Sequence, residues 1–153
     1  MSKEEEKVNA ETQEGIFHLA EKTREYFGVQ YNLEGVKKIE QEIELLRNNF
    51  SNLSEAEKDK WVQSFGAFLG ICMLVNYGGE WTMNRETIGI KLKGSNYWAN
   101  PFGKVWKQMQ PGGEYDSISS FYEVSKSIDA ITKSADKNVK IQAPEKKPWW
   151  KVW

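Results

Sequence analysis

The longest apolar run in the chain, Phe65 to Val75, predicts a buried helix that leads into a strand. Apolar side chains recur at helical spacing before the run, and the pair Gly78-Gly79 follows it. After the glycines, apolar and polar residues alternate with a period of two, as in a strand with one buried face. Because a helix that crosses a bilayer needs about 20 apolar residues, the run is too short to be a membrane span.

The same patterns predict helices and strands along the rest of the chain. Helices are expected at about residues 11–27, 33–50, 54–77, 100–110 and 117–133. A hairpin is expected from strands at about 81–83 and 88–92, with a short third strand at 97–99. The chain is therefore predicted to have an α+β fold, with about five helices packed on one face of a small antiparallel sheet.

Local signals mark where several of these helices begin and end. Ser54 and Glu57 form a capping box, in which each side chain satisfies a backbone donor of the other residue. Asn100, followed by proline, predicts another helix start, and Asp116 is the expected cap of the last helix. Gly28 can end the first helix in the left-handed conformation.

Two glycines in the apolar helix, Gly66 and Gly70, lie four residues apart. Such spacing creates a flat strip on the helix surface, where another element can approach closely. Outside a membrane we interpret this strip as a site of internal packing.

Composition divides the chain into three parts. Residues 1–10 are predicted to be an acidic flexible arm, 11–133 a single α+β domain, and 134–153 a basic, Trp-rich tail. The net charge of −1 gives no basic excess for nucleic acid, so no nucleic-acid partner is expected. The N-terminus lacks the apolar stretch of a secretory signal, and Cys72 is the only cysteine. These features predict a cytoplasmic protein without disulfides.

No residue set typical of catalysis or cofactor binding is found in the sequence. The glycines match neither dinucleotide-binding nor phosphate-loop motifs, and they precede a strand where such loops follow one. Cys72 lies in the most apolar helix, where a thiol packs as a small hydrophobe, and His18 is the only imidazole. We therefore predict no catalytic residue, no cofactor and no metal site.

A pocket for a small molecule or sugar is the alternative to a protein-binding function. Trp81, Trp98 and Trp106 would line this pocket, with Glu80 at its rim and Tyr97 nearby. A genuine pocket would bring Glu80, Tyr97 and Trp98 around one concave surface.

A hydrolase that uses carboxylates would be the enzymatic form of this alternative. Glycoside hydrolysis needs two carboxyl groups a few ångströms apart. Glu80 is one candidate, and Glu114 and Asp116 in another loop are others. Carboxylates of this kind are usually solvated, so an enzyme is not our main prediction.

The C-terminal tail combines lysines with three tryptophans, Trp149, Trp150 and Trp153. One interpretation is a docking peptide, because tryptophan supplies a large contact area and dominates binding hot spots. A second interpretation is that the tail folds back and buries these rings against the protein's own sheet. A third is contact with a membrane surface, where tryptophan lies at the headgroup level and lysine meets anionic lipid.

Three spaced motifs resemble an uncharacterised bacterial α+β domain family. They are the helix segment 64–70 (SFGAFLG), the strand start 77–81 (YGGEW) and the helix start 100–105 (NPFGKV). The resemblance covers about residues 30 to 130 and implies an α+β fold without an assigned activity. Some similar small domains accompany bacterial toxins as neutralising partners. An acidic residue often follows the second helix glycine in the family, whereas this chain has Ile71, which argues against a carboxylate-dependent activity there.

Together these observations predict a non-catalytic domain that binds another protein, with toxin neutralisation as the most specific form. The predicted binding residues lie in the sheet region and in the tail: Glu80, Tyr97, Trp98, Trp149, Trp150 and Trp153.

Overall fold

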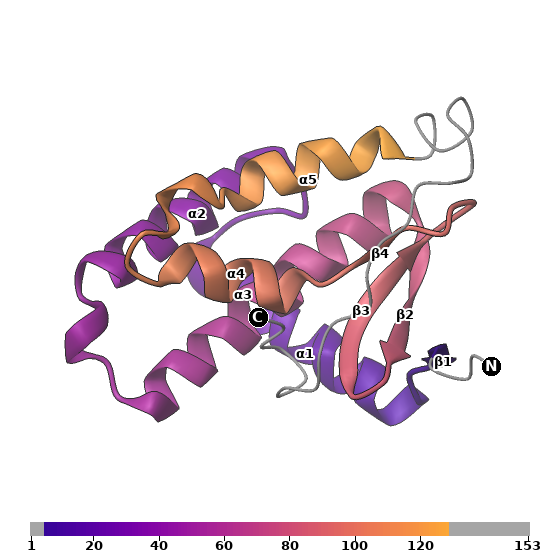
Figure 1. Cartoon of the computed structure of the whole chain (residues 1–153), viewed down its shortest axis with the longest axis horizontal. Coiled ribbons are helices and arrows are strands. Elements are labelled where there is room, and N and C mark those ends of the chain that lie inside the picture. The colour runs from indigo at the N-terminus through magenta and orange to yellow at the C-terminus, as the bar shows by residue number, and fades with distance from the viewer. Residues whose placement is uncertain (1–4, 129–153) are drawn as a thin grey trace.

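The computed structural model describes residues 5–128 and confirms the predicted α+β fold. These residues form five α-helices, two short 3₁₀ helices and one four-stranded antiparallel sheet (Figure 1). The helices are α1 (Ala10–Phe27), α2 (Leu33–Asn48), α3 (Glu55–Tyr77), α4 (Pro101–Met109) and α5 (Ile118–Lys126), with η1 (Phe50–Asn52) and η2 (Gly113–Tyr115). The strands, in their order across the sheet, are β1 (Glu5–Lys7), β2 (Gly79–Asn84), β3 (Thr87–Leu92) and β4 (Trp98–Ala99).

The helices form more than one layer on the sheet. Helices α3 and α4 contact the strands, and α1 packs along α3. Helices α2 and α5 pack against each other and against α3 and α4 (Figure 1). The sequence predicted that the helices pack on one face of the sheet. In the structure α3 and α4 contact the strands, whereas α2 and α5 pack mainly on these helices.

Helix α3 is the centre of the core. Its residues from Val62 to Met73 include eleven that are buried. Helices α1 and α4 pack extensively against α3, and α2 and α5 contact it over smaller areas. The prediction that the apolar run is a core helix is therefore confirmed. Among residues 5–128, no helix is both long and apolar enough to cross a membrane.

The predicted capping signals have the expected geometry at three helices. Ser54 and Glu57 form the capping box of α3, and the side chain of Asn100 accepts a hydrogen bond from Gly103 N at 3.0 Å. Gly28 ends α1 in the left-handed region with φ of 65°. Each signal is confirmed because it depends only on residues within one turn of the chain.

The expected cap of the last helix, Asp116, is wrong by one residue. Ser117 caps α5, because its hydroxyl accepts a hydrogen bond from Ser120 N at 3.1 Å. Asp116 instead forms an ion pair with Lys104, 3.4 Å away on α4. The helix ends at Lys126, and residues 129–133 of the predicted helix lie outside the described residues.

Residues 5–10 differ from the flexible arm that was predicted for residues 1–10. Glu5–Lys7 form strand β1, which pairs antiparallel with β2, and Val8 is buried. Asn9 then caps α1 by accepting a hydrogen bond from Thr12 N at 2.8 Å. Strand β1 has three charged residues and no apolar alternation, so its sequence shows no strand pattern. Its backbone hydrogen bonds to β2 hold it at the edge of the sheet.

The glycine strip of α3 is a packing site within the chain, as predicted. A Cβ atom on Gly66 would lie 2.3 Å from Cδ1 of Phe102, and one on Gly70 would lie 2.3 Å from Cη2 of Trp81. Both contacts are far shorter than the separation that carbon atoms normally keep. The two glycines therefore let α4 and the sheet approach α3 closely.

Candidate functional site

The sheet separates the tryptophans that were predicted to line one pocket. Trp81 pairs with Ile90, whereas Trp98 pairs with Lys91, the next residue along β3. Because neighbouring residues of a strand point to opposite faces, Trp81 and Trp98 lie on opposite faces of the sheet. Trp106, a residue of α4, packs against Phe50 of η1, with ring centroids 5.9 Å apart. The prediction of a pocket shared by the three rings is therefore wrong.

Glu80 and Trp98 do lie on the same face, in one row across the sheet. Glu80 pairs with Lys91, and Lys91 pairs with Trp98, so two strand spacings of about 4.8 Å each separate them. Glu80 is exposed and lies 3.9 Å from Lys7 of β1. A shallow hollow of about 540 Å³ beside Glu80 is lined by residues 78–80 and 91–95, which include neither Tyr97 nor Trp98.

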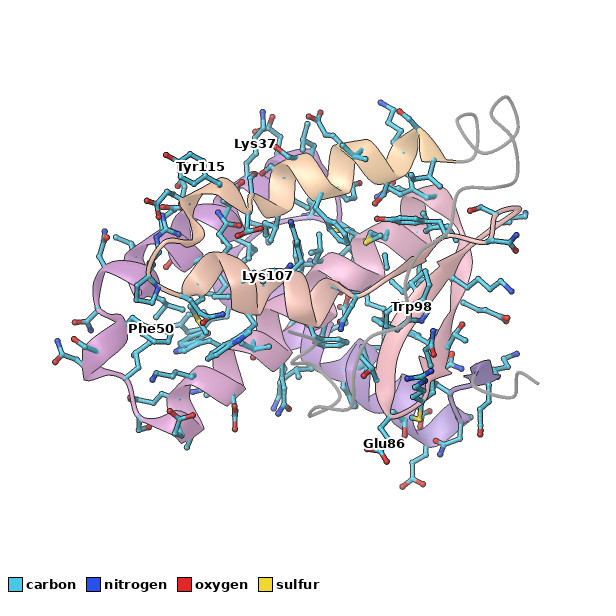
Figure 2. All side chains as sticks on the ribbon, in the orientation of Figure 1. Lys37, Phe50, Glu86, Trp98, Lys107 and Tyr115 are labelled. Carbon is cyan, nitrogen blue, oxygen red and sulfur yellow. The ribbon has the colours of Figure 1, made fainter. Side chains whose placement is uncertain are left out.

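Tyr97 and Trp98 are less accessible than binding residues of an open pocket would be. Trp98 is 7% exposed, and its ring lies over β3 (Figure 2). Burial raises the pKa of the Tyr97 phenol, whose hydrogen bond with Ser125 of α5 opposes that rise. The other predicted binding residues, Trp149, Trp150 and Trp153, lie outside the described residues.

The candidate carboxylates of a hydrolase each lie beside a different cation. Glu114 is 3.6 Å from Nε of Arg47, Asp116 is paired with Lys104, and Glu80 with Lys7. Among residues 5–128 we find no cluster of three His, Cys, Asp or Glu side chains that could hold a metal ion. Cys72 is buried, and burial raises the pKa of its thiol, so its packing agrees with the predicted role of a small hydrophobe.

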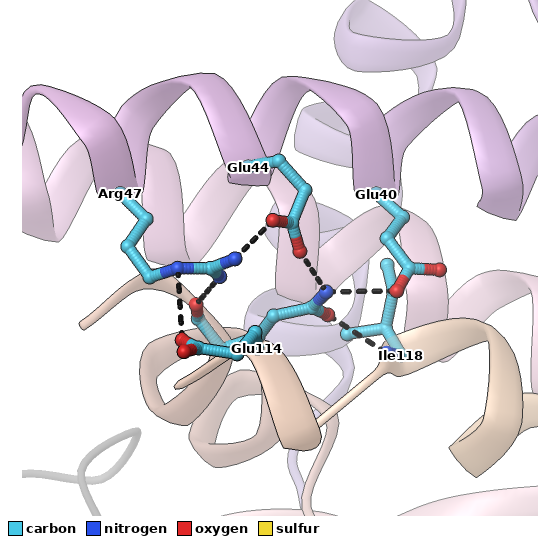
Figure 3. A network of polar contacts seen from close by, with 6 residues as sticks. Glu40, Glu44, Arg47, Glu114 and Ile118 are labelled. Atoms are coloured by element: carbon cyan, nitrogen blue, oxygen red, sulfur yellow. Dashed lines mark hydrogen bonds and ion pairs between the residues drawn. The ribbon is translucent and has the colours of Figure 1, made fainter. Parts of the chain in front are cut away.

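A network of polar side chains joins α2 to α4 and α5 (Figure 3). Gln108 of α4, which is fully buried, donates from Nε2 to Glu40 and Glu44 at 2.8 Å each. Its Oε1 accepts a hydrogen bond from Ile118 N at 2.8 Å, at the start of α5. Arg47 binds both Glu44 and the carbonyl oxygen of Gln108.

This network is a structural clamp, because its hydrogen-bonding groups satisfy one another. Burial acts to raise the pKa of Glu40, but hydrogen bonds from Ser119, Gln108 and Ser117 outweigh it, and the pKa is lowered overall. A carboxylate that is ionised and already hydrogen-bonded is poorly suited to accept a proton in catalysis. The sequence prediction missed the clamp, since its partners are separated by more than sixty residues along the chain.

A groove between α1 and α3 is the surface best suited to binding. It encloses about 530 Å³ and is lined by these residues: Leu19, Lys22, Thr23, Tyr26, Phe27, Lys60, Trp61 and Ser64. The two helices are joined beneath it by the Thr23 hydroxyl, which donates to the carbonyl oxygen of Ser64 at 3.3 Å. A larger hollow of about 670 Å³ between β1 and α1 contains a single aromatic residue, Phe17, and so offers fewer rings for binding.

The aromatic rings of this groove are held by one another. Phe27 lies 6.4 Å from Trp61 between ring centroids, and Trp61 stacks on Phe65 at 5.1 Å. Tyr26 packs edge-on against Phe27 at 4.8 Å but remains 78% exposed. A large ring that is supported from below and open to solvent is preorganised for a partner.

Positive charge flanks these rings. Nζ of Lys60 lies 5.2 Å from the centroid of Trp61, within the range of a cation–π contact. Lys22 lines the opposite wall, and the lining residues include no carboxylate. The groove therefore fits an apolar or aromatic group that has an acidic neighbour.

The sequence patterns placed Phe27, Tyr26 and Trp61 on helix faces without showing that they adjoin. Both Tyr26 and Phe27 lie in the predicted helix 11–27, but in the structure Phe27 packs against the core and Tyr26 is exposed. An available signal was that the adjacent Tyr26 and Phe27 cannot both face the core, because neighbouring residues of a helix point about 100° apart.

Comparison with known proteins gives no match. No protein-family model, curated protein or solved structure matches the chain. The resemblance to a bacterial α+β domain family therefore remains a prediction from three motifs, and the groove has to be interpreted from its own chemistry.

Proposed function

We propose that the protein is a non-catalytic binding domain that recognises another protein through the groove between α1 and α3. The observation that carries this proposal is Tyr26, a tyrosine that packs on Phe27 yet exposes most of its surface. Tyrosine and tryptophan dominate the energetics of protein interfaces, particularly where supporting residues already hold the ring in place.

The partner is a protein segment that presents an apolar side chain beside an acidic one. An apolar side chain fits among Tyr26, Phe27 and Trp61, and a volume of about 530 Å³ can take more than one such group. The acidic neighbour would meet Lys22 or Lys60 at the rim of the groove. Complementary charge at the rim mainly raises the association rate and selects among partners, so binding should weaken as salt is added.

Toxin neutralisation is the most specific form of this proposal. The support for it is the resemblance of segments 64–70, 77–81 and 100–105 to a bacterial family with similar domains beside toxins. In this form the partner is encoded next to the protein, and co-expression of the protein should protect a cell from that partner.

Affinity capture with three forms of the chain tests the proposal. Wild type, Tyr26→Ala and Tyr115→Ala are immobilised, and captured proteins are quantified after washing in low and high salt. Tyr115 is the matched control, because it is a 90% exposed tyrosine on η2, on the opposite side of the molecule from α1 (Figures 1 and 2). Both substitutions leave the core intact, so all three forms should fold.

A partner retained by wild type and Tyr115→Ala, but lost with Tyr26→Ala, supports the groove. Titration of the purified partner should then show a loss of at least about 2 kcal/mol of binding free energy for Tyr26→Ala. If a specific partner binds Tyr26→Ala as well as wild type, the groove is not its binding site. If wild type captures nothing from the source cells, the proposal of protein binding through this surface fails.

A further inference from the structure

The groove between α1 and α3 extends toward the β2–β3 hairpin through a second hollow. This hollow encloses about 320 Å³ and is lined by these residues: Thr12, Gly15, Ile16, Leu19, Gln63, Ala67, Ile88 and Phe102. Leu19 lines both hollows, so the two adjoin along α1 and α3. We call the combined surface the long groove; on α1 it reaches from Thr12 to Phe27, the last residue of the helix.

Five of the residues that α1 contributes to the long groove have the spacing of a coiled-coil seam. They are separated by three, four, three and four residues: Thr12, Gly15, Leu19, Lys22 and Tyr26. Positions with this spacing lie in one line along a helix and receive the side chains of a partner helix. None of the five is buried, so the seam is open to a partner. At a rise of 1.5 Å per residue it is about 21 Å long.

Helix α3 supplies the other wall of the long groove and runs antiparallel to α1. Lys60 and Trp61 of α3 lie at the end of the groove that contains Tyr26, whereas Gln63 and Ala67 lie at the other end. The residue numbers therefore rise along one wall and fall along the other. Two antiparallel helices that pack side by side leave a groove in which a third helix can lie, as in helical bundles.

The long groove fits a helical partner better than an extended one. An extended segment binds mainly by pairing its backbone with the free edge of a sheet. Within residues 5–128, the one sheet residue that lines the groove is Ile88 of β3, a strand that lies between β2 and β4. A helix satisfies its own backbone hydrogen bonds and can present a row of side chains to the two walls.

No contact among residues 5–128 accounts for the glycine at position 15, in the interior of α1. Glycine weakens a helix relative to alanine. Gly15 is not among the residues with positive φ, and a Cβ atom on it would have nothing within 4 Å. Gly66 and Gly70 of α3, in contrast, each make room for a ring of this chain. A glycine at a seam position lets the backbone of a second helix approach closely, which supports a helical partner.

Positive charge lies at one end of the long groove. Lys22 of α1 and Lys60 of α3 line it there, and the lining residues of both hollows include no carboxylate. The carboxylates that neighbour Lys22 along α1, Glu21 and Glu25, pair with Arg24. The two lysines therefore attract acidic side chains of a partner, and they do so at one end of the groove only.

We propose that the long groove binds an amphipathic helix of about four turns from the partner protein. The helix has an apolar stripe at heptad spacing, which lies between α1 and α3, and acidic residues at the end that meets Lys22 and Lys60. It comes closest to α1 at Gly15. This inference rests on the proposed function, because it uses the same groove, and it adds the secondary structure, the length and the charge pattern of the partner segment.

Two peptide libraries test the secondary structure of the partner, with the full chain as the target. Each library displays peptides of about 16 residues with the same proportions of leucine, phenylalanine, glutamate, glutamine and alanine. One library places the apolar residues at heptad positions a and d, and the other alternates them with polar residues. Enrichment from the heptad library alone is expected. Enrichment from the alternating library to the same degree, or from neither library, would overturn the proposal.

Two substitutions then locate the enriched peptide on the protein, and each has a matched control. Gly15→Gln fills the low point of the seam, whereas His18→Gln places the same side chain at an exposed position of α1 that lines neither hollow. Lys22→Glu reverses a charge in the groove, and Lys37→Glu reverses one at an exposed position on α2 (Figure 2).

Gly15→Gln should weaken binding of the enriched peptide at least about tenfold, because the added side chain occupies the space of the partner helix. Its Tm should not fall below that of wild type, since the added atoms extend into open space. Lys22→Glu should weaken binding about three- to tenfold at low salt and less at high salt. The two control variants should bind as wild type does; a loss as large in His18→Gln as in Gly15→Gln would contradict the proposal.

Tyr26→Ala separates failure of this inference from failure of the proposed function. If Tyr26→Ala loses the enriched peptide while Gly15→Gln binds it as wild type does, the groove binds its partner but not along the seam, and this inference alone is wrong. If both variants bind the peptide as wild type does, the groove is not the binding site, and both proposals are wrong.

Discussion

Replacement of Gly66 by alanine tests whether α4 packs against α3 as closely as the structure shows. The added Cβ would lie 2.3 Å from Cδ1 and 2.9 Å from Cα of Phe102, and the second atom belongs to the backbone of α4. Carbon atoms pack at about 3.5–4.0 Å, so α4 has to move by roughly 1 Å. Overpacking of this kind costs about 1–3 kcal/mol.

A second glycine provides the matched control for this substitution. Gly15 lies within α1, and a Cβ at that position has nothing within 4 Å. Both substitutions gain about 1 kcal/mol from the higher helix propensity of alanine, and only Gly66→Ala adds the clash. We therefore expect Gly15→Ala to be more stable than wild type by up to about 1 kcal/mol, and Gly66→Ala to be less stable than wild type by up to about 2 kcal/mol.

Urea denaturation followed by far-ultraviolet circular dichroism measures both free energies of unfolding. The two variants differ by the clash alone, about 1–3 kcal/mol, which corresponds to roughly 2–12 °C in Tm for a chain of this size. The slope of the urea dependence should be the same for all three proteins. If Gly66→Ala is as stable as Gly15→Ala, the close approach of Phe102 to α3 does not exist, and the argument for the glycine strip fails.

Three further predictions concern the clamp and the caps. Gln108→Leu should lower the free energy of unfolding by about 2–4 kcal/mol, because Ile118 N and two carboxylates lose their partner; a urea midpoint equal to wild type would contradict the clamp. Because the pKa of Glu40 is lower in the folded chain than its ordinary value of 4.5, its contribution to stability is present above that value and is lost as the pH falls through the folded pKa. Glu40→Gln should therefore lose less stability than wild type between about pH 6 and about pH 3 in urea titrations, and equal losses would show that Glu40 is not responsible. Ser54→Ala removes the capping box of α3 and should cost about 1 kcal/mol in the same assay, whereas Ser51→Ala, at an exposed site outside α3, should change little.

The candidate binding site shows which inferences need more than a helix pattern. The rings of Tyr26, Phe27 and Trp61 were each expected on a helix, and each is on one. Their meeting in a groove depends on how α1 crosses α3, which no short stretch of sequence specifies. The clamp around Gln108 was missed for the same reason, since Glu40 contacts it across 68 residues of chain.

Errors in the predicted elements arose where tertiary contacts outweigh a local pattern. Val75 and Val124 continue the apolar stripes of their helices but are 63% and 55% exposed. Strand β1 has no apolar alternation, and it forms because its backbone pairs with that of β2. Ser117 caps α5 in place of Asp116, which is drawn instead to Lys104 on α4.

The sequence by itself determined the elements whose causes lie within a few residues: the capping box at Ser54, the left-handed Gly28, the hairpin after Gly79 and the core position of α3. These features follow from backbone hydrogen bonding and side-chain periodicity, which act over one or two turns. Only the tertiary structure decided that Trp81 and Trp98 are on opposite faces of the sheet and that Tyr26 is exposed. Strand register and helix crossing set those outcomes, and both depend on contacts between residues far apart in the chain.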